Sequence, residues 1–316
     1  MGDFTKMSKS NLSAQRFEAY AELDKLALIL RIGIGSVFII GGWNKLYQLL
    51  SSGLQAKIVA SYTGTAGYIN QFFADWMFSN DALFTPWSFL TALSAFELLS
   101  GVALIAGLMV RPLSIIYAFL MWTFVVSLPV MTTPGAEFAG KTYLAPALFV
   151  QIRDIALSGM MFVLYNLGSG VHSLDERLFG KSATEPLVDW ESLGLLMRLS
   201  IGVIFIIGGV FAGMPNIKTF GIPGLLLVLV GAGLIAGIGV RALGAIIMAL
   251  MIYYILTKLT FSKSIIGNLN GVKREFAFFA AGLVLALKGG GERFTLMDII
   301  DRMSVSMTAL KSQLKT

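Results

Sequence analysis

The chain contains the stretch Arg31-Ile-Gly-Ile-Gly-Ser-Val-Phe-Ile-Ile-Gly-Gly42, which returns as Arg198-Leu-Ser-Ile-Gly-Val-Ile-Phe-Ile-Ile-Gly-Gly209. Two further blocks recur in the same order. Gly101-Val-Ala-Leu-Ile-Ala-Gly-Leu-Met-Val-Arg111 is followed later by Gly231-Ala-Gly-Leu-Ile-Ala-Gly-Ile-Gly-Val-Arg241, and Arg153-Asp154-Ile-Ala by Arg274-Glu275-Phe-Ala. Blocks that recur in one order are the signature of an internal repeat. The sequence therefore predicts two related halves.

The composition is that of a membrane protein. Hydrophobic residues make up 56% of the chain and charged residues 13%, and the mean hydropathy is +0.78. Such values lie outside the range of soluble globular domains. The chain has no cysteine and one histidine, which argues against thiolate metal sites, iron–sulfur clusters and a haem held by two histidines. We therefore expect no haem, metal or iron–sulfur cluster in this chain.

Apolar segments of about 20 residues, the length that crosses a bilayer, occur four times in each half. They cover 26–47, 86–110, 112–130, 145–167, 194–213, 222–238, 242–259 and 275–287. Short connections at Arg111-Pro112 and at Arg241 require neighbouring spans to run antiparallel. Because four is an even number, the two halves share one orientation. We predict an all-α integral membrane protein with eight transmembrane helices in two parallel four-helix bundles.

The predicted organisation follows from these spans. It comprises an N-terminal segment 1–25, a first repeat 26–180 with long outer loops, a linker 181–193, a second repeat 194–300 and a tail 301–316. Basic residues are more frequent on the side of both termini, so the positive-inside rule places the termini in the cytoplasm and the protein in the inner cell membrane. The net charge of +6 is better explained by this topology and by anion capture than by nucleic-acid binding.

Glu97 is the most informative single residue. It lies about 15 Å into its predicted span, where a carboxylate is costly and marks a functional site by default. Arg153 and Asp154 are expected at comparable depth in the fourth span of the first half. We predict Glu97 and Asp154 as catalytic residues. The alternative is a charge pair of Glu97 with Arg153 that only joins two helices.

Further polar and aromatic residues have predicted roles. Arg31 and Arg198 occur in both halves, so we expect them to be structural, with side chains that extend to the headgroups. Tyr117 and Trp122 could stack on a quinone ring or belong to the core. Substrate-binding residues are expected to be the basic groups near the outer face: Lys45, Lys57, Lys141 and Arg153.

The second half lacks the polar residues of the first. Ala212 stands at the position of Lys45, and Leu227 at the position of Glu97. We therefore expect the second half to act as a scaffold and the first half to hold the site.

A family resemblance accompanies these patterns. The motifs that carry it are Arg-Ile-Gly-x-Gly with Gly-x-Asn-Lys-Leu in the first span, Glu97-Leu-Leu-Ser-Gly101, Gly107-Leu-Met-Val-Arg111, and Gly168-Ser-Gly170-Val-His-Ser173-Leu-Asp175. In these the first half resembles the DoxX family of four-helix membrane proteins, and the long outer segments resemble its DoxD branch. The second half is similar to a degenerate DoxX copy that ends at Gly289-Gly-Gly291-Glu-Arg-Phe-Thr295-Leu-Met-Asp298.

The resemblance implies a function. DoxD is the membrane subunit of thiosulfate:quinone oxidoreductase, so it implies oxidation of a small sulfur oxyanion at the outer face, electron transfer to a diffusible membrane quinone, and a DoxA-like partner subunit. Two other functions stay open. One is a non-catalytic accessory subunit of a respiratory or other membrane oxidoreductase complex, and the other is a small-solute transporter. Lipid, quinone and other protein subunits are the expected partners.

The predicted topology can be tested directly, because the chain has no natural cysteine. Ser52→Cys and Thr133→Cys should react with a membrane-impermeant thiol reagent in intact cells, whereas Ser182→Cys should react only after lysis. Labelling of Ser182→Cys in intact cells would reverse the predicted orientation.

Overall fold

The structure is a computed structural model of the 316-residue chain. It describes residues 9–63, 68–79, 83–128, 137–138, 141–142, 145–170, 172–180, 185–213, 217 and 219–313. The helices before residue 180 are α1(Lys9–Leu50), α2(Ser52–Thr63), α3(Gln71–Met77), α4(Pro86–Ala106), α5(Val110–Val126), α6(Ala145–Leu167) and α7(Leu174–Phe179). Those of the second half are α8(Trp190–Val210), α9(Gly224–Ala236), α10(Val240–Lys258), α11(Ile265–Lys288) and α12(Leu296–Gln313). Strands β1(Glu137–Phe138) and β2(Lys141–Thr142) form a small antiparallel hairpin.

The predicted all-helical membrane class is confirmed, while the number of spans stays a prediction. Among the described residues, the helices that are long and apolar enough to cross a bilayer are Glu22–Leu50, Pro86–Ala106, Trp190–Val210 and Val240–Lys258. Helices α5 and α9 are apolar but shorter. The 13 residues of α9 rise about 20 Å, against a hydrocarbon thickness of about 30 Å.

Left-handed backbone makes the two tight helix connections. Gly107 (φ 73°) ends α4 and Met109 (φ 52°) precedes α5, as Gly237 (φ 73°) ends α9 and Gly239 (φ 59°) precedes α10. A left-handed φ is costly for a residue with a side chain. At Met109 the connection is held by Asp175, whose carboxylate accepts hydrogen bonds from the backbone N–H groups of Met109 (2.7 Å) and Val110 (2.9 Å).

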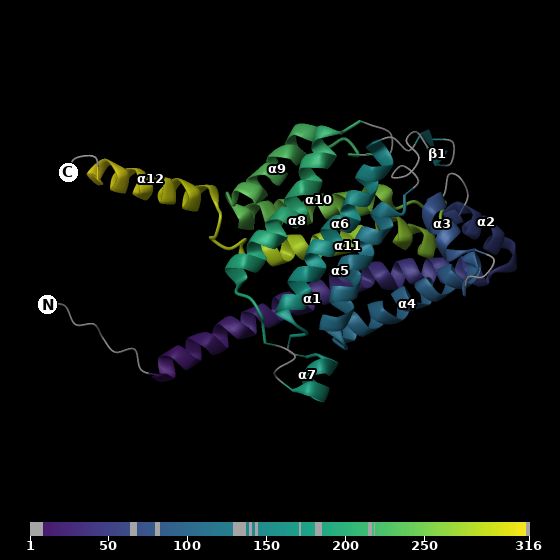
Figure 1. The fold of residues 1–316 in the computed structure, drawn as a ribbon, viewed down its shortest axis with the longest axis horizontal. Coiled ribbons are helices and arrows are strands. Elements are labelled where there is room, and N and C mark those ends of the chain that lie inside the picture. The colour runs from purple at the N-terminus through teal and green to yellow at the C-terminus, as the bar shows by residue number, and fades with distance from the viewer. Residues whose placement is uncertain are drawn as a thin grey trace.

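The helices of the two halves interlock. Within the halves, α1 packs on α4 and α5 on α6, as α8 packs on α9 and α10 on α11. Between the halves, α1 packs extensively on α11 and α6 on α8, whereas α1 and α6 touch much less. Each first helix thus lies against the fourth helix of the other half (Figure 1). The contacts describe one interlocked body, and the division into two parallel four-helix bundles stays a prediction.

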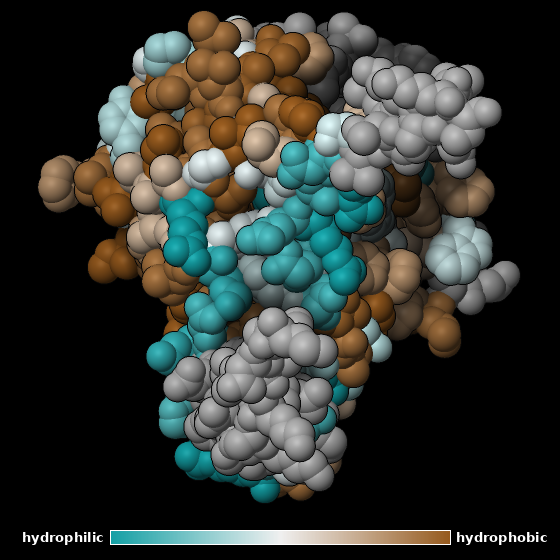
Figure 2. All heavy atoms as spheres, turned by 90° about the vertical axis from the view of Figure 1, so that its left-hand side faces the viewer, coloured by the Kyte–Doolittle hydropathy of each residue, from teal (hydrophilic) through white to brown (hydrophobic). Residues whose placement is uncertain are grey.

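The two ends of the molecule differ. The N-terminal part of α1 and the whole of α12 project from one end, while α2, α3 and the hairpin lie at the other (Figure 1). Seen from the end with the termini, hydrophilic side chains gather at the centre and hydrophobic ones cover the flanks (Figure 2). Exposed apolar flanks are expected of a surface that faces lipid.

Glycines set the closest helix approaches. A Cβ atom added at Gly42 on α1 would lie 2.6 Å from the backbone N of Leu98 and 2.7 Å from the backbone O of Ser94 on α4. The same pattern occurs in the second half, where a Cβ at Gly202 on α8 would lie 2.9 Å from the backbone O of Gly231 on α9. Small residues of this kind let helix backbones touch inside a membrane.

Gly42→Leu should therefore destabilise the protein, because the added side chain meets backbone atoms that cannot move away. We expect a loss of about 1–3 kcal/mol or more and a clear fall in the midpoint of thermal unfolding in mild detergent. Gly53→Leu is the matched control, since nothing lies within 4 Å of a Cβ at Gly53. Equal midpoints for the two variants would contradict the tight α1–α4 contact.

Candidate functional site

Among the described residues four acidic side chains are buried. One of them, Asp175, accepts the backbone hydrogen bonds described above, and each of the other three forms an ion pair between helices. Glu97 Oε2 on α4 lies 2.5 Å from Lys45 Nζ on α1. Asp154 on α6 accepts two hydrogen bonds from Arg274 on α11, at 2.8 and 3.0 Å. Glu275 on α11 pairs with Lys258 on α10. The exposed fractions of the three acids are 4%, 3% and 6%, so these charges are largely removed from solvent.

Two further basic residues join these pairs. Lys273 Nζ lies 3.0 Å from the position that a Cβ of Gly41 would occupy, and donates a hydrogen bond of 2.9 Å to Asn270 Oδ1. Arg153 interacts electrostatically with both Asp154 and Glu275. We name the set the charged cluster: Lys45, Glu97, Arg153, Asp154, Lys258, Lys273, Arg274 and Glu275.

The charged cluster has more basic than acidic members. Five of its residues are Lys or Arg and three are Asp or Glu. With every group ionised the cluster carries a net positive charge, which attracts anions in a low-dielectric surrounding. Among the described residues, no group of His, Cys, Asp and Glu side chains is arranged to hold a metal ion.

Two tyrosines lie beside the charged cluster outside the spanning helices. Tyr62 on α2 and Tyr68 after it are in ring contact, with centroids 5.1 Å apart. Tyr62 interacts electrostatically with Lys45 and Glu97. Burial raises the pKa of both hydroxyls, so these groups remain neutral. The α2 segment thus places hydrogen-bonding groups that carry no charge next to the charged cluster.

The structure corrects the predicted division between a functional half and a scaffold half. The charged cluster that contains Glu97 and Asp154 also contains four residues of the second half: Lys258, Lys273, Arg274 and Glu275. The positions equivalent to Lys45 and Glu97 give no sign of these residues, because they hold Ala212 and Leu227. The recurrence of Arg153-Asp154 as Arg274-Glu275 is the signal that could have identified them.

Glu97 is paired with a different residue from the one that the helix-joining alternative predicts. The helix-joining alternative assumed Arg153 as its partner, but the partner is Lys45. Two other predicted substrate-binding lysines are not part of the charged cluster as described. Lys57 is exposed on α2, and the side chain of Lys141 lies outside the described residues.

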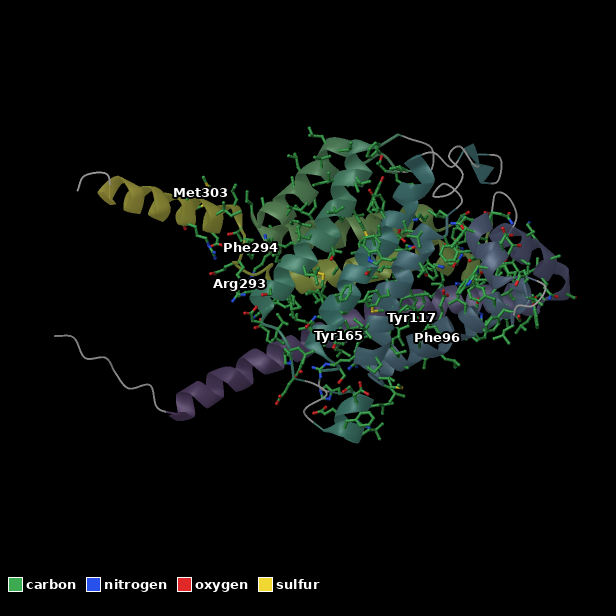
Figure 3. The ribbon with its side chains drawn as sticks, viewed as in Figure 1. Phe96, Tyr117, Tyr165, Arg293, Phe294 and Met303 are labelled. Carbon is green, nitrogen blue, oxygen red and sulfur yellow. The ribbon has the colours of Figure 1, made fainter. Side chains whose placement is uncertain are left out.

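Tyr117 and Trp122 do not form a shared quinone site. Tyr117 is fully buried, its ring stacks on Phe38 at 3.7 Å between centroids and on Phe96 at 5.5 Å, and its hydroxyl lies 2.6 Å from Ser100 Oγ. Figure 3 shows Tyr117 and Phe96 side by side in the body of the molecule. Trp122 is 47% exposed on the outer surface of α5. The core alternative therefore holds for Tyr117.

Arg31 and Arg198 are buried instead of extending to the headgroups, with exposed fractions of 1% and 0%. Arg31 donates to the backbone carbonyls of Ser169, Ile105 and His172. Arg198 donates to those of Gly290, Ile235 and Arg293, at 2.9, 3.2 and 2.7 Å. Each guanidinium thus ties its helix to the end of the next apolar helix and to the loop after the fourth one. The expected structural role stays a prediction, and these contacts provide a physical basis for it.

A cavity of about 150 Å³ lies in the second half, beside the charged cluster. Its polar lining consists of Arg153, Lys258, Glu275 and Thr219. Its apolar lining consists of Ile204, Phe205, Gly208, Ile217, Phe220, Leu227, Met251, Tyr254 and Phe278.

The ion pair of Asp154 with Arg274 can be tested by a double substitution. Asp154→Leu leaves the guanidinium unpaired between α6 and α11, and should cost about 3 to 5 kcal/mol of stability. Adding Arg274→Met removes the orphaned charge and should restore most of the thermal midpoint in detergent. A double variant as unstable as Asp154→Leu would show that the pair does not join the halves.

Comparisons with known proteins give one result. No curated protein and no solved structure matches the chain significantly. The model of the DoxX family matches residues 26–129, about a third of the chain. The matched stretch includes the apolar part of α1 and all of α4 and α5, with Lys45, Glu97 and the buried Arg31. The chain therefore carries a DoxX domain in its first half.

Proposed function

We propose that the protein is the membrane subunit of a quinone-linked oxidoreductase of the DoxD type, which oxidises a small sulfur oxyanion at the outer face of the inner cell membrane. The single observation that carries the proposal is the buried charged cluster with its excess of basic groups. An anion that approached the charged cluster would be attracted by Lys45, Lys273 and Arg153. The DoxX domain over residues 26–129 supports the membrane class of the subunit.

The proposed reaction balances with thiosulfate as the oxyanion. Two thiosulfate dianions each lose one electron, and a sulfur–sulfur bond joins them as tetrathionate. The quinone accepts these two electrons and takes up two protons to become a quinol. The chain has to hold the anion, deliver protons and bind the quinone, and a partner subunit of the DoxA kind would complete the complex.

Glu97 and Asp154 are suited to different tasks. Asp154 accepts two hydrogen bonds from the planar guanidinium of Arg274, a bidentate geometry that fixes the orientation of the carboxylate. Glu97 is paired with the single flexible ammonium group of Lys45. A carboxylate with one flexible partner is held less rigidly than one in a bidentate pair, so we assign proton delivery to Glu97 and positioning of the cluster to Asp154.

We also propose that the second half is a degenerate DoxX copy. Arg31 and Arg198 bind carbonyls at corresponding places, which are Ile105 and Ile235 at the ends of α4 and α9. Gly107 and Gly237, next to these arginines, share φ 73°. Matching buried contacts at matching positions are what a duplication preserves.

The second candidate is a non-catalytic accessory subunit of a membrane oxidoreductase complex. It is favoured by the pairing of every acid in the charged cluster with a base on a different helix or half, because such pairs can serve packing alone. Exposed aromatic residues at the end that carries α2 and α3, such as Phe72 (67%) and Trp76 (74%), would then contact a partner.

Turnover of the protein in lipid nanodiscs separates the two candidates. With thiosulfate, a short-chain ubiquinone and any subunit that copurifies, we expect quinone reduction. Glu97→Gln should lower it by roughly 10²- to 10⁴-fold, as for loss of a general acid or base, with normal protein yield. Glu22→Gln, the same change in a residue that pairs with Lys288 near the end that carries the termini, is the control. Unchanged turnover in folded Glu97→Gln would exclude the proton role, and no turnover in the wild type would favour the accessory subunit.

A further inference from the structure

The cavity of the second half lies at a position whose equivalent in the first half is filled by side chains. In the first half, Lys45 and Glu97 meet between α1 and α4. The equivalent residues are Ala212 and Leu227, and Leu227 lines the cavity. The two halves thus have equivalent helices and equivalent buried arginines. They differ in whether side chains occupy the space at the positions of Lys45 and Glu97.

A pair of equivalent glycines shows the same difference. A Cβ atom at Gly41 would meet Lys273 Nζ at 3.0 Å, whereas nothing lies within 4 Å of a Cβ at Gly208. Gly208 lines the cavity. The side chain of Lys273 therefore occupies the space beside Gly41, whereas the space beside Gly208 is open.

The walls of the cavity are suited to a flat apolar group. Phe205 from α8, Tyr254 from α10 and Phe278 from α11 lie around it, together with Phe220. Lys258 Nζ lies 5.8 Å from the ring centroid of Phe220 and 6.0 Å from that of Tyr254. Aromatic side chains bind other rings by stacking or edge contacts. The apolar part of the cavity thus favours a ring over a hydrated ion.

The polar residues of the cavity are suited to oxygen acceptors. Arg153 and Lys258 are hydrogen-bond donors only, and Glu275, ion-paired with Lys258, stands beside them. Glu275 offsets the charge of one of the two cations, and a neutral carbonyl oxygen would accept a hydrogen bond from either cation. A volume of about 150 Å³ is below the roughly 300 Å³ of typical ligand pockets. It therefore suits one substituted ring.

We propose that this cavity binds a quinone head group, a single ring with carbonyl oxygens that accept hydrogen bonds from Arg153 and Lys258. The choice of quinone among ring ligands rests on the proposed function. Glu275 is the carboxyl group of the cavity lining, whereas Glu97, to which proton delivery is assigned, lies outside the lining and would act through the charged cluster. The first half then attracts the anion and the second half binds the electron acceptor, with Arg153 and the Asp154–Arg274 pair between them.

The experiment measures binding and not turnover. Wild-type protein in nanodiscs is photolabelled with an azido derivative of a short-chain ubiquinone, and the labelled peptides are mapped by mass spectrometry. We expect label on α8, α10 or α11, and competition by unlabelled quinone but not by thiosulfate.

Gly208→Leu tests the location. The Cβ of the leucine would meet nothing within 4 Å, and leucine is a better helix former than glycine, so the fold should be kept. We expect quinone affinity to fall at least about tenfold. Gly271→Leu on α11 is the matched control, because its Cβ also meets nothing within 4 Å and it lies outside the lining. Leu227→Phe fills the same cavity from α9 and should act like Gly208→Leu.

The outcomes separate this inference from the proposed function. Quinone reduction with full affinity in both cavity-filling variants would overturn the cavity site and leave the oxidoreductase proposal standing. Binding that the cavity-filling variants abolish, without any thiosulfate-dependent reduction, would support the site and remove the proposed reaction. Absence of labelling in the wild type would overturn the site.

Discussion

The bidentate ion pair between Asp154 and Arg274 is the interaction on which the arrangement of the two halves depends. It joins the fourth helix of one half to the fourth helix of the other. Removing two charges from water is costly, and only good geometry with several hydrogen bonds offsets that cost. The pair is therefore formed only when both halves are in place. Around it, α1 packs on α11 and α6 on α8, so neither half has a complete interior by itself.

The two halves use the same framework for different purposes. In both, a buried arginine binds three carbonyls and a left-handed glycine ends the second apolar helix. The difference lies in side-chain volume. Lys45, Glu97 and Tyr117 fill the interior of the first half, while Ala212, Leu227 and Ile247 stand at the equivalent positions of the second. Similar helical frameworks can thus hold a charge pair in one half and a cavity in the other.

The site could be predicted only in part. A carboxylate such as Glu97 in an apolar segment is costly, so its functional or paired role follows from the sequence. Its partner does not, because a lysine on an antiparallel helix can reach it only at one register of α1 against α4. The surroundings of Tyr117 and Trp122 could not be predicted for a related reason. Residues five positions apart face different sides of a helix, and only packing shows which side is the core.

The sequence by itself determined the membrane class, the helix order, the tight turns and the repeated blocks, because these depend on local hydropathy, glycine and proline positions and chain order. The tertiary structure alone decided which helix lies against which. In one arrangement of two parallel halves, each half packs only on itself. In another, the first helix of each half packs on the fourth helix of the other. The apolar pattern of each helix is compatible with both. The choice depends on surfaces far apart in the chain, where Arg274 meets Asp154 and Gly41 meets Lys273. Those contacts place second-half cations in the site and leave the cavity beside Gly208 open.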